Sequence, residues 1–237
     1  MWRPRALVEA AQAAGVERLL FFSTISVYGA SVCGRLLDEE TPPHPSTLYA
    51  ETKWRAEEAV RQARNRAGEA LGVVLRLAAV YGPHMRGNYC TLAQALQKGR
   101  FFYVGNGQNR RTLVFDADVA QAALLVAESA AAAGQTYNVS DGQIYTLQQI
   151  VETICHVQHS RPPKLHLSPA ILRGAAAVCQ AGAEMVGLRA PITPALIDKL
   201  TEDVAVSSAK LQRELGFAPA VNLQQGWQAT LGGAAGP

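Results

Sequence analysis

A tyrosine and a lysine stand four residues apart in the segment LYAETKW, residues 48–54. Residues at that spacing lie one turn apart on the same face of a helix, so Tyr49 and Lys53 can act together. A free phenol has a pKa of about 10 and is a poor base at neutral pH, but a nearby ammonium favours the phenolate. Such a tyrosine can take a proton from an alcohol while a cofactor takes the hydride. The pair alone is weak evidence, because an aromatic residue and a charge often share a helix surface.

A cluster of hydroxyl side chains precedes this pair in FFSTISVYG, residues 21–29. Ser23, Thr24 and Ser26 follow a short apolar run that predicts a fully buried strand. Ligands of open α/β sheets bind at the carboxyl ends of the strands. Thr24 lies 25 residues before Tyr49, and a loop with a helix start of that length can return Tyr49 to Thr24. Together the two segments favour a site that acts on an alcohol over a chance pattern.

The elements around these residues alternate between strands and helices. GVVLRL, residues 72–77, predicts a second buried strand, and Leu147, Ile150, Val151 and Ile154 fall at helical spacing. Apolar strands that alternate with helices are typical of an α/β protein with a parallel sheet.

Two helices of this pattern have expected bounds. The Tyr49 helix is predicted over about residues 46–66, with Ser46 or Thr47 as its cap. The apolar segment 169–187 predicts a mostly buried helix. Its charges, Arg173 and Glu184, argue against an integral membrane segment, although a peripheral membrane contact stays open.

Composition narrows the class of protein. The chain has 237 residues, of which 49% are hydrophobic and 17% charged, enough for one large domain or two small ones. A net charge of +3 without a long basic run argues against nucleic acid as a partner. The four cysteines are far apart, form no CxxC and follow no secretory leader, so reduced thiols and a cytoplasmic location are expected.

Three segments carry a resemblance to a known family. FFSTISVYG, LYAETK and LRLAAVYGP resemble successive signatures of the extended short-chain dehydrogenase/reductases, the NAD-dependent epimerase/dehydratase group. The resemblance implies that Thr24 hydrogen-bonds the reacting hydroxyl and that Tyr49 is the acid/base. It implies that Lys53 lowers the tyrosine pKa and holds the nicotinamide ribose. The cofactor contacts that it implies come from Ser23, Tyr49, Lys53, Leu77 and Val80.

The segment GNGQNRRTLVFDADVA resembles the nucleotide-sugar members of that family. There an arginine contacts the diphosphate or the nucleoside ribose, and Arg111 matches it best, with Arg110 adjacent. A diphosphate needs a fixed cation, and arginine binds it bidentately. The alternative is a solvated arginine pair. Asn88, in RGNY, stands where these enzymes use an amide for the diphosphate-sugar.

One part of the family pattern is missing from the sequence. A dinucleotide site needs a glycine-rich turn after the first strand, but only 22 residues precede Ser23 and they hold no GxGxxG or GxxGxxG. The resemblance therefore implies an N-terminally truncated, doubly wound Rossmann-type sheet without its first strands, and a smaller, mainly helical lobe. The partial NAD(P)-binding domain is expected over residues 1–82 and 114–144, and the substrate-binding lobe over residues 83–113 and 145–237.

The function predicted from this pattern is NAD-dependent epimerisation at C4 of a UDP-sugar through a 4-keto intermediate, with NADP not excluded as cofactor. One alternative is an NAD(P)H-dependent 4-keto reductase of surface-polysaccharide synthesis. Another is an inactive fragment, or a module that binds a nucleotide sugar without turnover. A dehydratase is disfavoured, because Ile25 and Ser26 follow Thr24 where those enzymes carry Asp-Glu.

Two further expectations concern metals and assembly. Cys155, His156 and His159 cluster in CHVQH without a second ligand pair, so no metal site is expected. The resemblance implies a homodimer for the full-length form.

Overall fold

A parallel three-stranded sheet lies at the centre of the fold. The computed structural model describes residues 4–29, 34–185 and 193–232. The sheet has the order β1-β2-β7, formed by β1 (Leu19–Thr24), β2 (Gly72–Leu77) and β7 (Thr136–Val139). Leu75, at the centre of β2, lies beside Phe22 of β1 and Tyr137 of β7. The predicted α/β class with a parallel sheet is confirmed.

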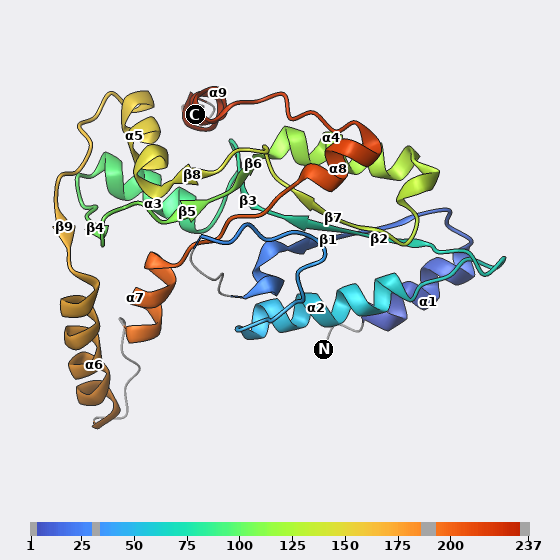
Figure 1. The fold of residues 1–237 in the computed structure, drawn as a ribbon, viewed down its shortest axis with the longest axis horizontal. Helices are drawn as coiled ribbons and strands as arrows, with labels where there is room; N and C mark the ends of the chain where they lie inside the picture. The colour runs from blue at the N-terminus through green and yellow to red at the C-terminus, as the bar shows by residue number, and fades with distance from the viewer. Residues whose placement is uncertain (1–3, 30–33, 186–192, 233–237) are drawn as a thin grey trace.

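Helices cover both faces of this sheet (Figure 1). The helices α1 (Pro4–Ala14) and α2 (Leu48–Arg61) lie on one face. The helix α4 (Asp116–Glu128) lies on the other, and α8 (Ala209–Leu215) packs beside β7. The apolar residues of the strands meet those of α4 and α8 in one core cluster, which includes Val73, Leu75, Val126, Val139 and Leu211.

The strand β1 departs from the sequence prediction. Its apolar residues are only partly buried, and Phe22 is 43% exposed. The prediction of a fully buried strand was therefore wrong. In the described part of the chain β1 pairs with β2 on one side and forms the outer strand of the sheet. A strand at the edge of a sheet has one flank without a neighbour, and its side chains are correspondingly less covered.

The Tyr49 helix is shorter than expected at its carboxyl end. It ends at Arg61 rather than near Arg66. The side-chain oxygen of Asn65 accepts from the backbone N–H groups of Ala67 and Glu69, at 2.9 Å each. These local bonds give the backbone an alternative to further helical turns.

A second core cluster follows in the chain. Its strands, β3 (Ala79–Tyr81) and β6 (Leu113–Phe115), pair in parallel, and Trp227 stacks on Tyr81 with ring centroids 5.1 Å apart. Around them pack α3 (Asn88–Gln97), α5 (Leu147–Val157) and α9 (Leu223–Gly232). The remaining short elements are β4 (Tyr103–Val104), β5 (Arg110–Arg111), β8 (Tyr145–Thr146), β9 (His166–Leu167), η1 (Ile25–Tyr28) and η2 (Ala130–Ala132).

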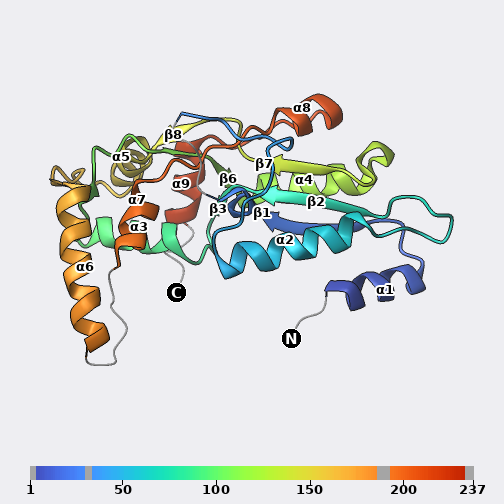
Figure 2. The ribbon, with the colours of Figure 1, turned by 60° about the horizontal axis from the view of Figure 1, so that its bottom comes forward.

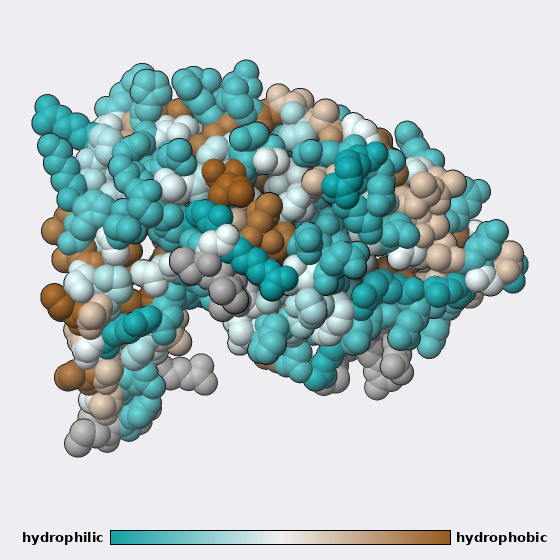
Figure 3. Space-filling view, in the orientation of Figure 1, coloured by the Kyte–Doolittle hydropathy of each residue, from teal (hydrophilic) through white to brown (hydrophobic). Residues whose placement is uncertain are grey.

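The helices α6 (Pro169–Met185) and α7 (Pro194–Thr201) project away from the sheet (Figures 1 and 2). Ala176 of α6 is buried, but Ile171 and Val178 are 73% and 75% exposed, and apolar residues show on this part of the surface (Figure 3). The prediction of a mostly buried helix was therefore wrong. Within the described ranges, no helix has both the length and the apolar character needed to cross a bilayer.

Candidate active site

The amino-terminal end of α2 presents Tyr49 to solvent. The side chain of Thr47 caps the helix and accepts from the backbone N–H of Ala50 at 3.2 Å, which decides between the two predicted caps. Tyr49 therefore lies in the first turn, and its side chain is 59% exposed. A phenol placed there is free to meet a bound molecule.

Lys53 joins this helix to the end of β1. Its Nζ donates to the carbonyl of Phe22 at 2.9 Å and lies 6.0 Å from the centroid of the Tyr49 ring. Burial lowers the pKa of the Lys53 ammonium, and the negative charge of Glu57, one turn further along α2, opposes that shift. An ammonium has three donors, and among the described residues one of them is used.

Thr24 stands where β1 ends. Its hydroxyl oxygen accepts from the backbone N–H of Ser26 at 3.2 Å and caps η1, and its O–H donates to the Ser26 hydroxyl, also at 3.2 Å. Because η1 packs against α2, Thr24 lies at the same end of the sheet as Tyr49 and Lys53. The structure thus brings the three predicted catalytic residues to the carboxyl end of β1. Their catalytic roles stay a prediction.

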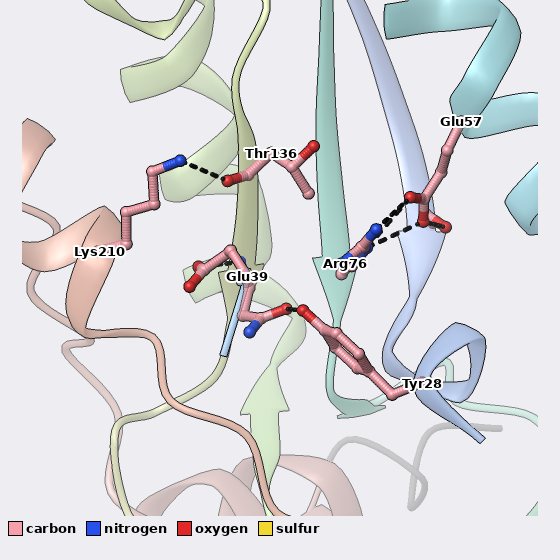
Figure 4. Close-up of polar contacts among 8 residues, drawn as sticks. Tyr28, Glu39, Glu57, Arg76, Thr136 and Lys210 are labelled. Carbon is pink, nitrogen blue, oxygen red and sulfur yellow. Dashed lines mark hydrogen bonds and ion pairs between the residues drawn. The ribbon is translucent and has the colours of Figure 1, made fainter. Parts of the chain in front are cut away.

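Ser23 points the other way. It is buried, and its hydroxyl donates to the carboxylate of Glu57 at 2.5 Å. Glu57 is also bound by Arg76 of β2, and Figure 4 shows these two side chains directed toward each other. The hydroxyl of Ser23 therefore faces the interior, and a cofactor contact by this residue stays a prediction.

Sequence reasoning missed Glu57 and Arg76, although two signals for them exist. Glu57 follows Lys53 by one further turn, so it shares the face of Tyr49 and Lys53. Arg76 is a charge inside the apolar strand GVVLRL. A charge within a strand of that kind needs a buried partner.

The predicted diphosphate residue Arg111 contacts carbonyl groups of the chain itself. Its Nη1 donates to the carbonyls of Glu202 and, at 3.0 Å, Arg110, and its Nη2 lies 3.5 Å from that of Lys199. Burial lowers the pKa of the Arg111 guanidinium. The adjacent Arg110 pairs with Asp203 at 3.3 Å. Arg111 is thus half-buried and held at the end of α7, and its diphosphate role stays a prediction.

The other predicted contact residues, Asn88, Leu77 and Val80, lie in α3, β2 and β3, and their roles stay predictions. Asn88 is the first residue of α3 and is exposed. Leu77 ends β2 and is half-buried, and Val80 of β3 is 38% exposed. Burial raises the pKa of Tyr89, next to Asn88, to about 12, and the positive charge of Arg111 opposes that shift.

Comparison with known proteins decides the family. The model of the NAD-dependent epimerase/dehydratase family matches residues 3–140. The chain belongs to this family. The match covers β1, α2, β2 and β7, the elements that carry Thr24, Tyr49 and Lys53.

Two relatives match nearly the whole chain at low sequence identity. An uncharacterized protein of Sinorhizobium fredii is 30% identical, over 94% of this chain and 64% of its own length. The N-acetyl-α-D-glucosaminyl-diphospho-ditrans,octacis-undecaprenol 4-epimerase of Escherichia coli O157:H7 is 25% identical, over 96% of this chain and 68% of its own length. The chain thus spans about two thirds of the length of these relatives.

A solved structure shares the fold. The UDP-glucuronic acid 4-epimerase of Bacillus cereus, in complex with UDP-glucuronic acid and NAD, has a TM-score of 0.73 and 19% identity. The alignment covers 98% of this chain and 65% of that protein. This likeness supports the Rossmann-type arrangement of the sheet.

Proposed function

We propose that this chain carries the acid/base site of an NAD-dependent enzyme that epimerises C4 of a diphosphate-linked sugar, with a UDP-sugar as the substrate class. The observation that carries the proposal is the exposed Tyr49 beside a Lys53 ammonium that is fixed at the end of β1. The 4-epimerases of Escherichia coli and Bacillus cereus support the choice of C4.

The residues present fit the nicotinamide end of NAD. Lys53 keeps donors free beyond its bond to Phe22 within the described part of the chain, as a ribose contact requires. NAD, when bound, would accept the C4 hydride and return it. No glycine-rich GxGxxG or GxxGxxG turn for its pyrophosphate stands in this sequence.

In the proposed reaction the protein residues move and hold the proton. Tyr49 takes the proton of the C4 hydroxyl, and the hydroxyl of Thr24 orients that group. The 4-keto sugar then presents its other face, and Tyr49 returns the proton to the C4 oxygen. Lys53 stabilises the negative charge on Tyr49 while the proton is on the sugar side.

The test is an epimerisation assay followed by NMR of the C4 proton, at millimolar NAD so that weak cofactor affinity does not hide turnover. Tyr49→Phe is expected to lower kcat at least about 100-fold, because it removes the group that moves the proton. Leu48→Ala, at an 80% exposed neighbour in the same helical turn, is the matched control and should keep turnover. Equal and measurable turnover in Tyr49→Phe and wild type would contradict the assignment.

The missing glycine-rich turn keeps the binding module as a second candidate. Calorimetry with UDP-sugar and with NAD separates the possibilities. Sugar binding without turnover supports a module that binds a nucleotide sugar. The absence of sugar binding and of turnover supports an inactive fragment. We expect NAD to bind this chain weakly or not at all, and a micromolar affinity would show that expectation to be wrong.

A further inference from the structure

A fully buried carboxylate lies behind the proposed acid/base site. Glu57 of α2 is 0% exposed, so it cannot touch a substrate. The polar groups that face it are the guanidinium of Arg76 from β2 and the hydroxyl of Ser23 from β1, while Lys53 lies one turn away on its own helix. Any influence of Glu57 on the reaction must therefore pass through these neighbours.

Two successive turns of α2 hold two successive residues of β1. The Nζ of Lys53 donates to the carbonyl of Phe22 at 2.9 Å, and the hydroxyl of Ser23 donates to Glu57 at 2.5 Å. Thr24 follows Ser23 in β1, and Tyr49 lies one turn before Lys53 in α2. The two contacts therefore set the position of the Thr24 hydroxyl relative to the Tyr49 phenol.

Arg76 fixes the carboxylate in this position. Its Nε lies 3.2 and 3.1 Å from the two oxygens of Glu57, and its Nη2 donates to Oε2 at 2.7 Å. Arg76 is the register partner of Ser23 in the sheet, and its guanidinium carbon lies over the ring of Tyr28, 4.8 Å from the centroid. A planar guanidinium with several bonds to one carboxylate leaves that group little freedom to rotate.

The charge of Glu57 also acts on Lys53. Burial disfavours the Lys53 ammonium and lowers its pKa, and Glu57 opposes this shift. The other neighbours of the ammonium are the Phe22 carbonyl and the rings of Phe21 and Tyr49, at 5.0 and 6.0 Å from Nζ to the centroids. Of the neighbours in the described structure, Glu57 is the one that brings a carboxylate to this side of Lys53.

We propose that Glu57 is a positioning residue of the Thr24–Tyr49–Lys53 site. Clamped by Arg76, it sets the end of β1 against α2 through Ser23 and keeps a negative charge behind the Lys53 ammonium. The inference rests on the proposed function for the roles of Tyr49 and Thr24. The test measures the protonation of Lys53 directly. The inference can therefore fail while the proposed function stands, and the proposed function can fail while the inference stands.

The experiment follows trace acetylation of Lys53 as a function of pH, with the peptide quantified by mass spectrometry. Only the uncharged amine reacts, so the midpoint of the curve reports the pKa of Lys53. In Glu57→Gln we expect the midpoint to fall by about one pH unit, because an opposite charge is removed. The exposed Lys98 in the same samples serves as an internal reference for reagent and pH.

Three further variants separate charge from packing. Glu57→Gln leaves Arg76 buried without its partner, so if circular dichroism shows a loss of fold, Glu57→Gln/Arg76→Met replaces it, and a lowered midpoint is again expected. Glu57→Asp keeps the negative charge, so its Lys53 midpoint should lie close to that of the wild type. Ser23→Ala removes the hydroxyl contact alone and should leave the midpoint in place.

Two results of the acetylation experiment would overturn the role of the Glu57 charge. One is an unchanged Lys53 midpoint in the folded Glu57→Gln or double variant. The other is a shift of the same size in Ser23→Ala, which would show that any disturbance of this contact moves Lys53. For the positioning role, Ser23→Ala should lower kcat more than it raises KM, and an unchanged kcat would contradict that role.

Discussion

Arg76 and Glu57 show how a single pair of charges is accommodated inside the first core cluster. The side chains are 2% and 0% exposed, and neither could be buried alone without a large loss of solvation. Their mutual bonds and the Ser23 hydroxyl satisfy most of the pair, and the Tyr28 ring lies beside the guanidinium. Among the described residues, the Nη1 of Arg76 has no hydrogen-bond partner. Figure 4 shows that Tyr28 also reaches toward β7, where its hydroxyl donates to Asn138 at 2.8 Å. The pair therefore links α2, β1 and β2 at one point.

Removal of one charge of the Arg76–Glu57 pair should destabilise the protein far more than removal of both charges. Arg76→Met is expected to lower the free energy of unfolding by about 3–5 kcal/mol, because Glu57 is left as an uncompensated buried charge. Arg76→Met/Glu57→Gln should recover much of that loss. Urea unfolding measures both variants.

The control for this prediction is an exposed ion pair within α2. Arg55 and Glu51 pair at i, i+4 with side chains 72% and 45% exposed, and exposed pairs contribute at most about 1 kcal/mol. Arg55→Met should therefore change stability little. Equal losses in Arg55→Met and Arg76→Met would show that burial does not set the difference.

Among the elements, α2 matters most, because it carries Tyr49, Lys53 and Glu57 on one face. Its start is set by the Thr47 cap, two residues before Tyr49. A shift of the first turn would move Tyr49 while leaving Lys53 and Glu57, which are bound to β1, in place. The precision of the site therefore depends on the cap.

Thr47→Ala should lower the free energy of unfolding by about 1 kcal/mol, because the N–H of Ala50 loses its partner. Ser46→Ala is the matched control: Ser46 is exposed and stands one residue before the cap. Thermal unfolding followed by circular dichroism compares the two variants. A larger loss in Ser46→Ala would mean that the helix begins elsewhere.

The segment after α7 is tied to β5 by Asp203. Its carboxylate accepts from the backbone N–H of Arg110 at 2.7 Å, from that of Gly34 at 3.2 Å and from the Arg110 guanidinium at 3.3 Å. Burial would raise the pKa of Asp203, but these donors outweigh it and lower the pKa. An acid whose folded pKa is lowered stabilises the fold above its unfolded pKa of about 3.9, and this contribution is lost as the pH falls through the folded value.

Asp203→Asn should therefore destabilise the protein at pH 7 and lose this effect in acid. We expect a difference of about 1–3 kcal/mol from wild type at pH 7, since bonds to a charged acceptor are replaced. The difference should shrink as the pH falls below about 4. Urea unfolding at a series of pH values measures it, and a difference that is constant with pH would contradict the role of the carboxylate.

At the scale of the whole molecule, strands connect the two largest core clusters of the described residues. A single residue, Ala78, separates β2 from β3, and β6 leads directly into α4. Tyr81 of β3 and Leu113 and Phe115 of β6 belong to the second cluster. The first cluster takes residues from β2 and α4 and also Val114 of β6, so β6 contributes to both. Because each link is a continuous stretch of backbone, neither cluster can lose its strands without disturbing the other.

We therefore expect one cooperative unfolding transition. Trp54 packs against the first cluster and Trp227 lies in the second, so each can report on one of them. With Trp2 and one of these two replaced by Phe, urea curves from fluorescence and from far-ultraviolet circular dichroism should coincide in each variant. Separate midpoints within one variant would show that the clusters unfold independently.

Local sequence was enough to predict much of the fold. The two predicted strands, the helix that carries Tyr49 and Lys53, and the helix from Leu147 all form, although the Tyr49 helix ends earlier and the first strand is less buried than predicted. These features depend on the spacing of apolar residues and on caps a few residues away, which are encoded in neighbouring positions. The meeting of Thr24 with the Tyr49 helix was also foreseen, because strand ends gather at one edge of a parallel sheet.

What the tertiary structure decided concerns segments that are distant in the chain. The exposure of β1 depends on which strands flank it. The exposure of α6 depends on how much of the chain packs against it. The same holds for Arg111, whose guanidinium meets the end of α7, and for Glu57, whose partner Arg76 stands on another element. Spacing along the sequence determined that Tyr49 and Lys53 share a helix face. Only packing between elements decided that a buried carboxylate stands behind them, because burial depends on every element that surrounds a residue.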